Sequence, residues 1–72
     1  MNEYIVYDTL INEYTVVHGT TSIEAIRTYL ANRNMTGVLH RSNSDKAVRF
    51  RVTKVDNGKS VGRRQWYSYE QV

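Results

Sequence analysis

Basic and aromatic side chains are interleaved through the C-terminal half of the chain, a combination suited to contacts with phosphates and bases. Arginine and lysine pair with phosphate oxygens, and aromatic rings stack on bases. Residues 1–30 hold four acidic residues and one basic residue, whereas residues 31–72 hold nine basic and three acidic residues. This asymmetry predicts an acidic partner for the basic half. The candidate contacts with nucleic acid or another partner are Arg49, Arg51, Lys54, Lys59, Arg63, Arg64, Trp66 and Tyr67.

The same residues have a second interpretation as a solvated sheet face. Arginines would then keep the exposed side of a sheet soluble while Trp66 anchors the core. The formal net charge of +3 is weaker than dedicated nucleic-acid binders usually show. Both interpretations stay open at this point.

Residue types that catalyse reactions or bind metal are present but scattered. His18 and His40 have no second histidine or carboxylate at the i+3 or i+4 spacing of a helical metal site. Cysteine is absent, which removes disulfides and thiolate ligands together. The sequence contains no nucleophile elbow and no glycine-rich phosphate loop. We therefore expect no enzymatic activity, no metal and no cofactor.

The tyrosine content and the short chain together suggest self-association. A domain of 72 residues without disulfides has a marginal core, and a partner subunit is one way to stabilise it. Six tyrosines and one tryptophan are a high load for this length, and such side chains are enriched in protein interfaces. Packing against the sheet explains them equally well. We predict a homodimer.

The N-terminal half predicts two strands followed by a helix. Residues 3–9 and 13–18 are rich in β-branched and aromatic side chains, and a short connection makes them a hairpin. Thr21 and Glu24 match a capping box, and Ile23, Ile26 and Leu30 follow with helical spacing. These features predict a helix over residues 22–33, ended by the asparagines and glycine that follow it.

The C-terminal half predicts a second hairpin. Val48, Phe50 and Val52 alternate with Arg49 and Arg51, so residues 47–55 read as a strand with its arginines on one face. The Asn-Gly pair at 57–58 is typical of a tight turn, and residues 63–69 would return antiparallel. The fold class is therefore α+β, a single domain over residues 1–72 with order β-β-α-β-β and one helix packed on an antiparallel sheet.

A helix-turn-helix is an alternative for the middle of the chain. Residues 35–41 would form its second helix, but Gly37 disfavours a helix there, and Val38 and Leu39 leave few polar side chains to read bases. A single helix followed by irregular chain is the preferred interpretation.

Apolar runs are only a few residues long, and the N-terminus lacks a basic region, so we expect no membrane span, no signal peptide and a cytoplasmic location.

The opening Tyr4 to Asp8, the His18-Gly19-Thr20 segment and the capped helix from Ser22 resemble small uncharacterised phage and prophage proteins of Bacillus and related bacteria, in particular the YopT-like family. That resemblance implies a homodimer and assigns no activity or site residue. The layout is also similar to DNA-binding modules of homing endonucleases. The expected function is a non-enzymatic phage or prophage accessory protein, a homodimeric module that binds a host or phage protein. The alternative is nucleic-acid binding through the basic, aromatic-rich C-terminal half.

Overall fold

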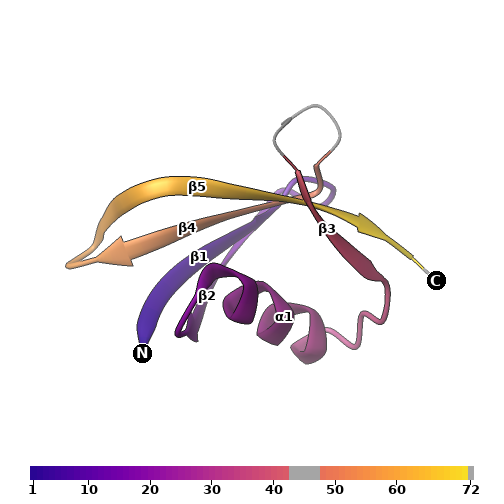
Figure 1. Ribbon diagram of the computed structural model, residues 1–72, viewed down its shortest axis with the longest axis horizontal. Helices are drawn as coiled ribbons and strands as arrows, with labels where there is room; N and C mark the ends of the chain where they lie inside the picture. Colours follow the sequence, from indigo (N-terminus) through magenta and orange to yellow (C-terminus); the bar gives the residue numbers. More distant parts are fainter. Residues whose placement is uncertain (43–47, 72) are drawn as a thin grey trace.

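The computed structural model describes residues 1–42 and 48–71. One helix lies across one face of a five-stranded antiparallel sheet (Figure 1). The strand order is β2-β1-β4-β5-β3, so β2 and β3 are the two edges. The elements along the chain are β1 (Asn2–Asp8), β2 (Glu13–Gly19), α1 (Ser22–Asn32), β3 (Val38–Ser42), β4 (Phe50–Asp56) and β5 (Lys59–Glu70). Within these described ranges, no helix is long and apolar enough to cross a membrane.

The strand β3 corrects the predicted order to β-β-α-β-β-β. Residues 38–42, expected to be irregular chain or a second helix, pair antiparallel with β5 from Val38 opposite Glu70 to Ser42 opposite Trp66. Gly37 is needed just before this strand, because a Cβ there would overlap the Glu70 carbonyl oxygen and the Tyr69 ring. The helix-turn-helix interpretation is therefore wrong.

The helix α1 begins as predicted, with one difference at its cap. The Thr21 hydroxyl accepts a hydrogen bond from the Glu24 amide at 3.2 Å. The Glu24 carboxylate does not return to the Thr21 amide; it accepts from the Thr20 amide at 3.2 Å and the Thr20 hydroxyl at 2.7 Å. These hydrogen bonds to Thr20 lower the pKa of Glu24. Asn34, at φ 55°, ends the helical run in the left-handed conformation.

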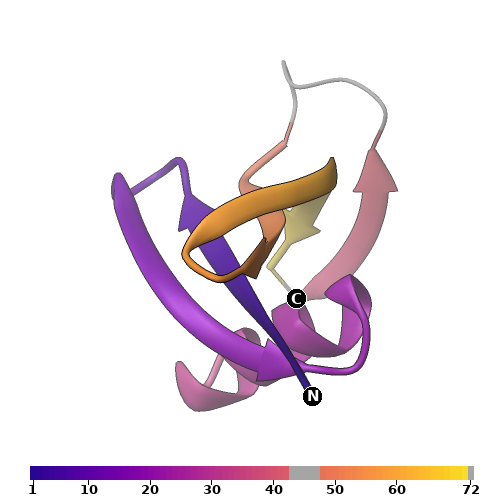
Figure 2. The same ribbon diagram turned by 90° about the vertical axis from the view of Figure 1, so that its left-hand side faces the viewer.

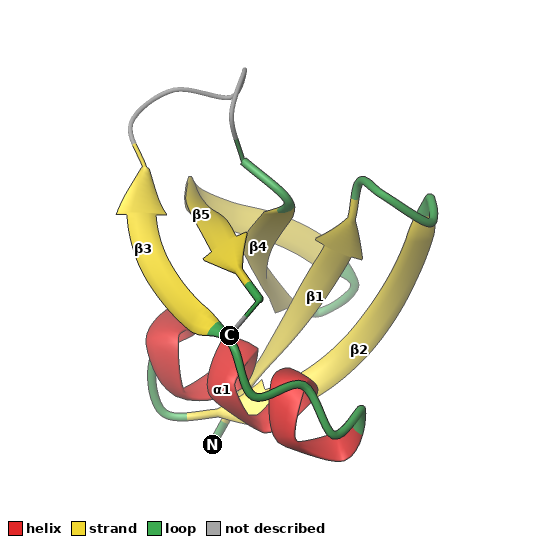
Figure 3. Cartoon of the chain, turned by 90° about the vertical axis from the view of Figure 1, so that its right-hand side faces the viewer, coloured by secondary structure: helices red, strands yellow, loops and turns green. Residues whose placement is uncertain are grey.

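The core fills the space between α1 and the sheet, which curves around the helix (Figures 2 and 3). The buried face of α1 includes Tyr29, whose ring meets the Phe50 ring edge-on at 5.7 Å. Ile23, predicted on this face together with Ile26 and Leu30, is only partly buried. The core residues are Tyr4, Val6, Val17, Ala25, Ile26, Tyr29, Leu30, Phe50, Val52 and Tyr67.

The β4–β5 hairpin extends beyond the helix (Figure 1). Asn57 and Gly58 both have positive φ, 51° and 77°, which confirms the predicted tight turn. The strand β5 begins at Lys59 rather than near residue 63, and a bulge interrupts its pairing with β4 between Val52 and Lys54.

Candidate functional site: the open face of the sheet

Four side chains form a continuous row across the sheet, one from each of four neighbouring strands. The registers place Tyr14 opposite Tyr7, Tyr7 opposite Arg51 and Arg51 opposite Trp66. We call these four residues the ladder. Tyr7, Arg51 and Trp66 each have a buried neighbour in the sequence. These neighbours are Asp8, Phe50 and Tyr67, which lie on the helix side of the sheet and are at most 1% exposed.

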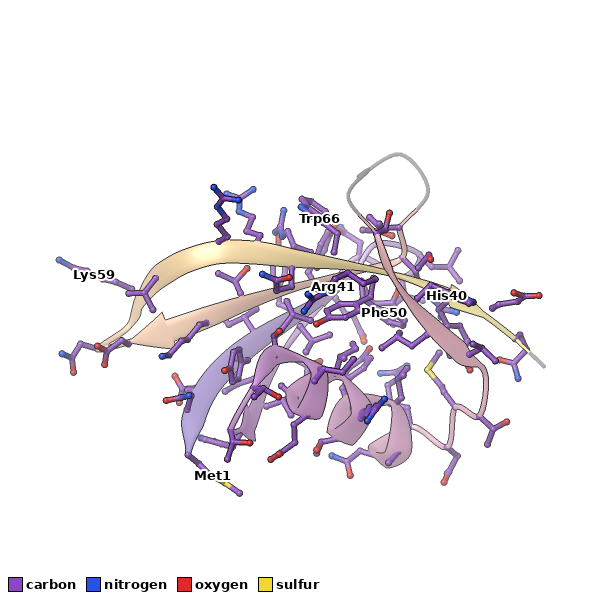
Figure 4. All side chains as sticks on the ribbon, in the orientation of Figure 1. Met1, His40, Arg41, Phe50, Lys59 and Trp66 are labelled. Atoms are coloured by element: carbon purple, nitrogen blue, oxygen red, sulfur yellow. The ribbon has the colours of Figure 1, made fainter. Side chains whose placement is uncertain are left out.

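The ladder therefore lies on the opposite side of the sheet, called here the open face. Trp66 projects away from the helix in Figure 4, whereas Phe50 lies between sheet and helix.

The ladder is held by ring stacking and cation–π contacts. The Tyr7 and Tyr14 rings stack with centroids 4.4 Å apart and planes 25° apart. The Arg51 guanidinium carbon lies 4.8 Å from the Tyr7 centroid and 5.8 Å from that of Trp66, so this cation bridges two rings. Tyr7 therefore contacts Tyr14 on one side and Arg51 on the other, and Arg51 contacts Tyr7 and Trp66. Other molecules can reach the outer ring face of Tyr14, which is 64% exposed, and the exposed part of Trp66.

A bulge in β5 sets which residue meets Arg51. Continuing the register of the Asn57-Gly58 turn would place Arg64 directly opposite Arg51, and like charges in that position destabilise a sheet. Gly62, at φ 72°, starts a bulge in which residues 62–64 lie opposite the single residue Thr53. The register moves by two, and Trp66 takes the place opposite Arg51.

Arg49 does not belong to the open face, contrary to the prediction from alternation. Its Nε lies 3.2 Å from Asp8 Oδ1, and its second guanidinium nitrogen donates to Asp8 Oδ2 at 3.3 Å. The Asp8 side chain is 0% exposed, and its Oδ1 also accepts from the Leu10 amide at 3.0 Å. The reason is that β4 begins at Phe50: Arg49 lies in the bend before it, where period-two alternation does not apply.

Tyr67 is likewise removed from the candidate surface. It is 1% exposed, and its hydroxyl lies 3.1 Å from the Ser22 hydroxyl of the helix. Trp66 and Tyr67 leave β5 on opposite sides, so only one of the two rings can face solvent. The core anchor expected at Trp66 is Tyr67. Its neighbour on the same side, Tyr69, accepts a hydrogen bond from the Gly37 amide at 2.6 Å.

The other basic candidates are exposed, but they do not all share one face. Lys54 lies opposite Tyr4 in register, so it leaves the sheet on the helix side. Arg63 and Arg64 are exposed in the bulge opposite Thr53. Lys59 stands at the tip of the hairpin (Figure 4), opposite Asp56, and its register places it on the same side as Lys54. Among the described residues, no acidic group lies within ion-pair distance of these four cations.

Exposed apolar side chains gather at the β1–β2 hairpin, a feature that the sequence interpretation did not use. Leu10, Ile11, Tyr14 and Val16 are 72%, 41%, 64% and 56% exposed. We call these four residues the hairpin patch. The two apolar residues in the turn were its only sequence signal. Because β2 is a sheet edge, the patch adjoins a row of backbone groups that no strand among the described residues covers.

A groove of about 450 Å³ separates the β2 edge from α1. Tyr29 lines it, and an ion pair between Arg33 and Glu13, 3.5 Å apart, joins helix to strand beside it. The Tyr29 hydroxyl is buried without a hydrogen-bond partner. Burial raises the pKa of this hydroxyl above its ordinary value.

The layout of strands and helix motivated the resemblance to YopT-like phage proteins. The added strand β3 changes that layout at one sheet edge. No comparison identifies such a relation, so the resemblance stays a prediction. Comparisons with protein-family models, with curated proteins and with solved structures found no match to this chain.

Proposed function

We propose that this chain is a non-enzymatic protein-interaction module that works as a homodimer, with a second copy bound along β2. The observation that carries the proposal is the hairpin patch: four of the six large apolar side chains found exposed lie on or beside this one strand. Contiguous exposed apolar surface is typical of protein contact sites. The described part of the chain offers the open β2 edge beside it.

A second copy fits this edge better than an unrelated strand because β2 is self-complementary. Antiparallel pairing centred on Val16 places Val16 opposite Val16 and Tyr14 opposite His18. Glu13 then lies opposite Gly19, so no like charges face each other. Such pairing is isologous, as in most homodimers.

This register also keeps the two open faces on the same side of the joined sheet, because residues directly opposite share a face. The outer ring face of Tyr14 would be covered by His18 and Val16 of the second copy. The exposed apolar area of β2 and its unpaired backbone groups are thereby removed from water together.

Sedimentation equilibrium at micromolar concentration tests the proposal. The wild-type chain should show twice its mass of 8.4 kDa. Val16→Lys should be monomeric, because it sets two lysines directly opposite each other at the centre of the pairing. The matched control is Val38→Lys, which changes a valine of similar exposure on the other sheet edge and should stay dimeric.

A mixture of two oppositely charged variants tests whether Val16 lies opposite Val16 of the second copy. Val16→Glu alone should also be monomeric, whereas an equimolar mixture of the Val16→Glu and Val16→Lys chains should dimerise, since each lysine then meets a glutamate. If the wild type is monomeric, or if both single variants still dimerise, then no second copy binds along β2.

A further inference from the structure

We infer that the open face binds single-stranded nucleic acid, with a base stacked on Trp66 and phosphates on Arg63 and Arg64. The inference goes beyond the homodimer and stands on β4 and β5 rather than on β2. It keeps Arg63, Arg64 and Trp66 from the set singled out in the sequence. The residues that do not face this side are left out, namely Arg49, Lys54, Lys59 and Tyr67.

Trp66 supplies the stacking surface. The Arg51 guanidinium lies on one side of the indole, 5.8 Å from its centroid, and fixes the ring at the end of the ladder. The next residue in the row is Ser42 on β3, whose side chain is far smaller than an indole. Trp66 is partly exposed, so part of its ring is accessible to a planar base. Stacking of this kind tolerates any sequence, because every base has a π face.

The bulge of β5 supplies the charge. Residues 62–64 project opposite the single residue Thr53, which brings Arg63 and Arg64 out of the regular strand. Neither arginine has an acidic partner within ion-pair distance in the described ranges. The carboxylates of Glu3 and Glu70 are instead next to His18 and His40, at 3.6 Å and 3.9 Å. A phosphate would therefore meet cations that are not already neutralised.

A single strand fits these features better than a duplex. Bases inside a duplex are covered by their neighbours, and stacking on Trp66 would require one of them to be extruded. One stacking ring beside two cations matches the contact made by a short, unpaired segment. The inferred ligand is therefore single-stranded DNA or RNA of any sequence.

The intrinsic fluorescence of Trp66 provides a direct test, because it is the only tryptophan in the chain. Titration with an oligothymidylate of about 12 nucleotides at low salt should quench this fluorescence and raise the anisotropy of the labelled oligonucleotide. A duplex of the same length should bind more weakly and quench less. No quenching and no anisotropy change with DNA or RNA single strands would overturn the inference, as would tighter binding of the duplex.

Variants with matched controls separate this site from general charge attraction. Arg63→Ala with Arg64→Ala should lower the slope of log affinity against log salt by about 1.4, or about 0.7 per lost phosphate contact. The control, Arg27→Ala on the exposed side of α1, should leave that slope unchanged. If the double variant and the wild type had equal slopes, Arg63 and Arg64 would not contact phosphates.

Trp66→Leu tests the stacking itself. It should weaken oligonucleotide binding about 5- to 100-fold, measured by anisotropy on protein whose circular dichroism shows it folded. Unchanged affinity would overturn the stacking role. Val16→Lys should keep the Trp66 quenching, so failure of the dimer and failure of this site give different results.

Discussion

Arg49 and Asp8, 41 residues apart in the sequence, form an ion pair in which the carboxylate is completely buried and the guanidinium is 26% exposed. The same guanidinium lies over the rings of Phe50 and Tyr69, at 5.2 Å and 5.4 Å from their centroids. It therefore covers the end of the core while it neutralises Asp8, the only carboxylate that is buried among the described residues. Arg51, two positions later, bridges two rings on the other face of the sheet. Two arginines that look equivalent in the sequence thus have different roles.

Arg49→Ala should destabilise the fold by about 2 kcal/mol. Removing one member of a fully buried pair typically costs about 3–5 kcal/mol, and the partial exposure of Arg49 lowers that figure. Arg51→Ala is the matched control and should cost about 0.5–1 kcal/mol, the size of an exposed cation–π contact. Urea denaturation monitored by circular dichroism measures both. Equal costs would mean that the Asp8 ion pair contributes nothing beyond a surface contact.

Gly37→Ala should destabilise the protein by about 1–3 kcal/mol, the usual range for overpacking. A Cβ at this position would overlap the Glu70 carbonyl oxygen and the Tyr69 ring, so β3 and β5 would have to separate locally. The hydrogen bond from the Gly37 amide to the Tyr69 hydroxyl would be strained as well. Thermal unfolding compared with Ala31→Ser, a small change at an exposed helix position, measures the effect. A variant as stable as this control would show that the β3–β5 edge adjusts freely.

The sequence correctly predicted the elements that are determined by interactions between residues close together in the chain. The cap at Thr21 and the turn at Asn57-Gly58 use hydrogen bonds and backbone conformations within a few residues, so their signals survive in the sequence. The strand β3 has no such signal. It is five residues long at a sheet edge and mostly exposed, so no apolar alternation marks it, and its pairing with β5 decides its conformation.

The candidate site was predicted only in part for the same reason. Alternation correctly separates Arg51 from Phe50 inside β4, but it fails for Arg49, which lies before the strand begins. The ladder depends on registers between four strands and on the bulge at Gly62, which replaces Arg64 by Trp66 opposite Arg51. These registers pair residues that are far apart in the chain, so composition and the spacing of residues could not predict them.

Tyr29→Phe should increase the stability at neutral pH by about 1 kcal/mol. The Tyr29 hydroxyl is buried without a hydrogen-bond partner, and an unsatisfied buried polar group costs about 1–3 kcal/mol. The phenyl ring keeps the edge contact with Phe50 and the Arg33 guanidinium over it. Urea midpoints at pH 7 measure the change. A loss of stability on removing the hydroxyl would indicate that it makes a stabilising contact in solution.

The Tyr29 hydroxyl should also make the fold sensitive to alkali. Burial raises its pKa most strongly, Asp8 and Glu13 raise it further, and Arg33 and Arg49 oppose the shift. Because the folded pKa lies above the unfolded value of about 10, the folded state holds this proton over a range of pH in which the unfolded state has lost it. Below pH of about 10 both states hold the proton, so ionisation of Tyr29 does not change the stability. As pH rises from there through the folded pKa, only the unfolded state ionises readily, and the free energy of unfolding falls. The chain has six tyrosines, so the total alkaline loss cannot be assigned to one of them. Comparison with Tyr29→Phe isolates this residue, and the stability advantage of the variant should grow between pH of about 9 and about 11. If the two proteins lose stability in parallel over that range, the Tyr29 proton is not held by the folded state.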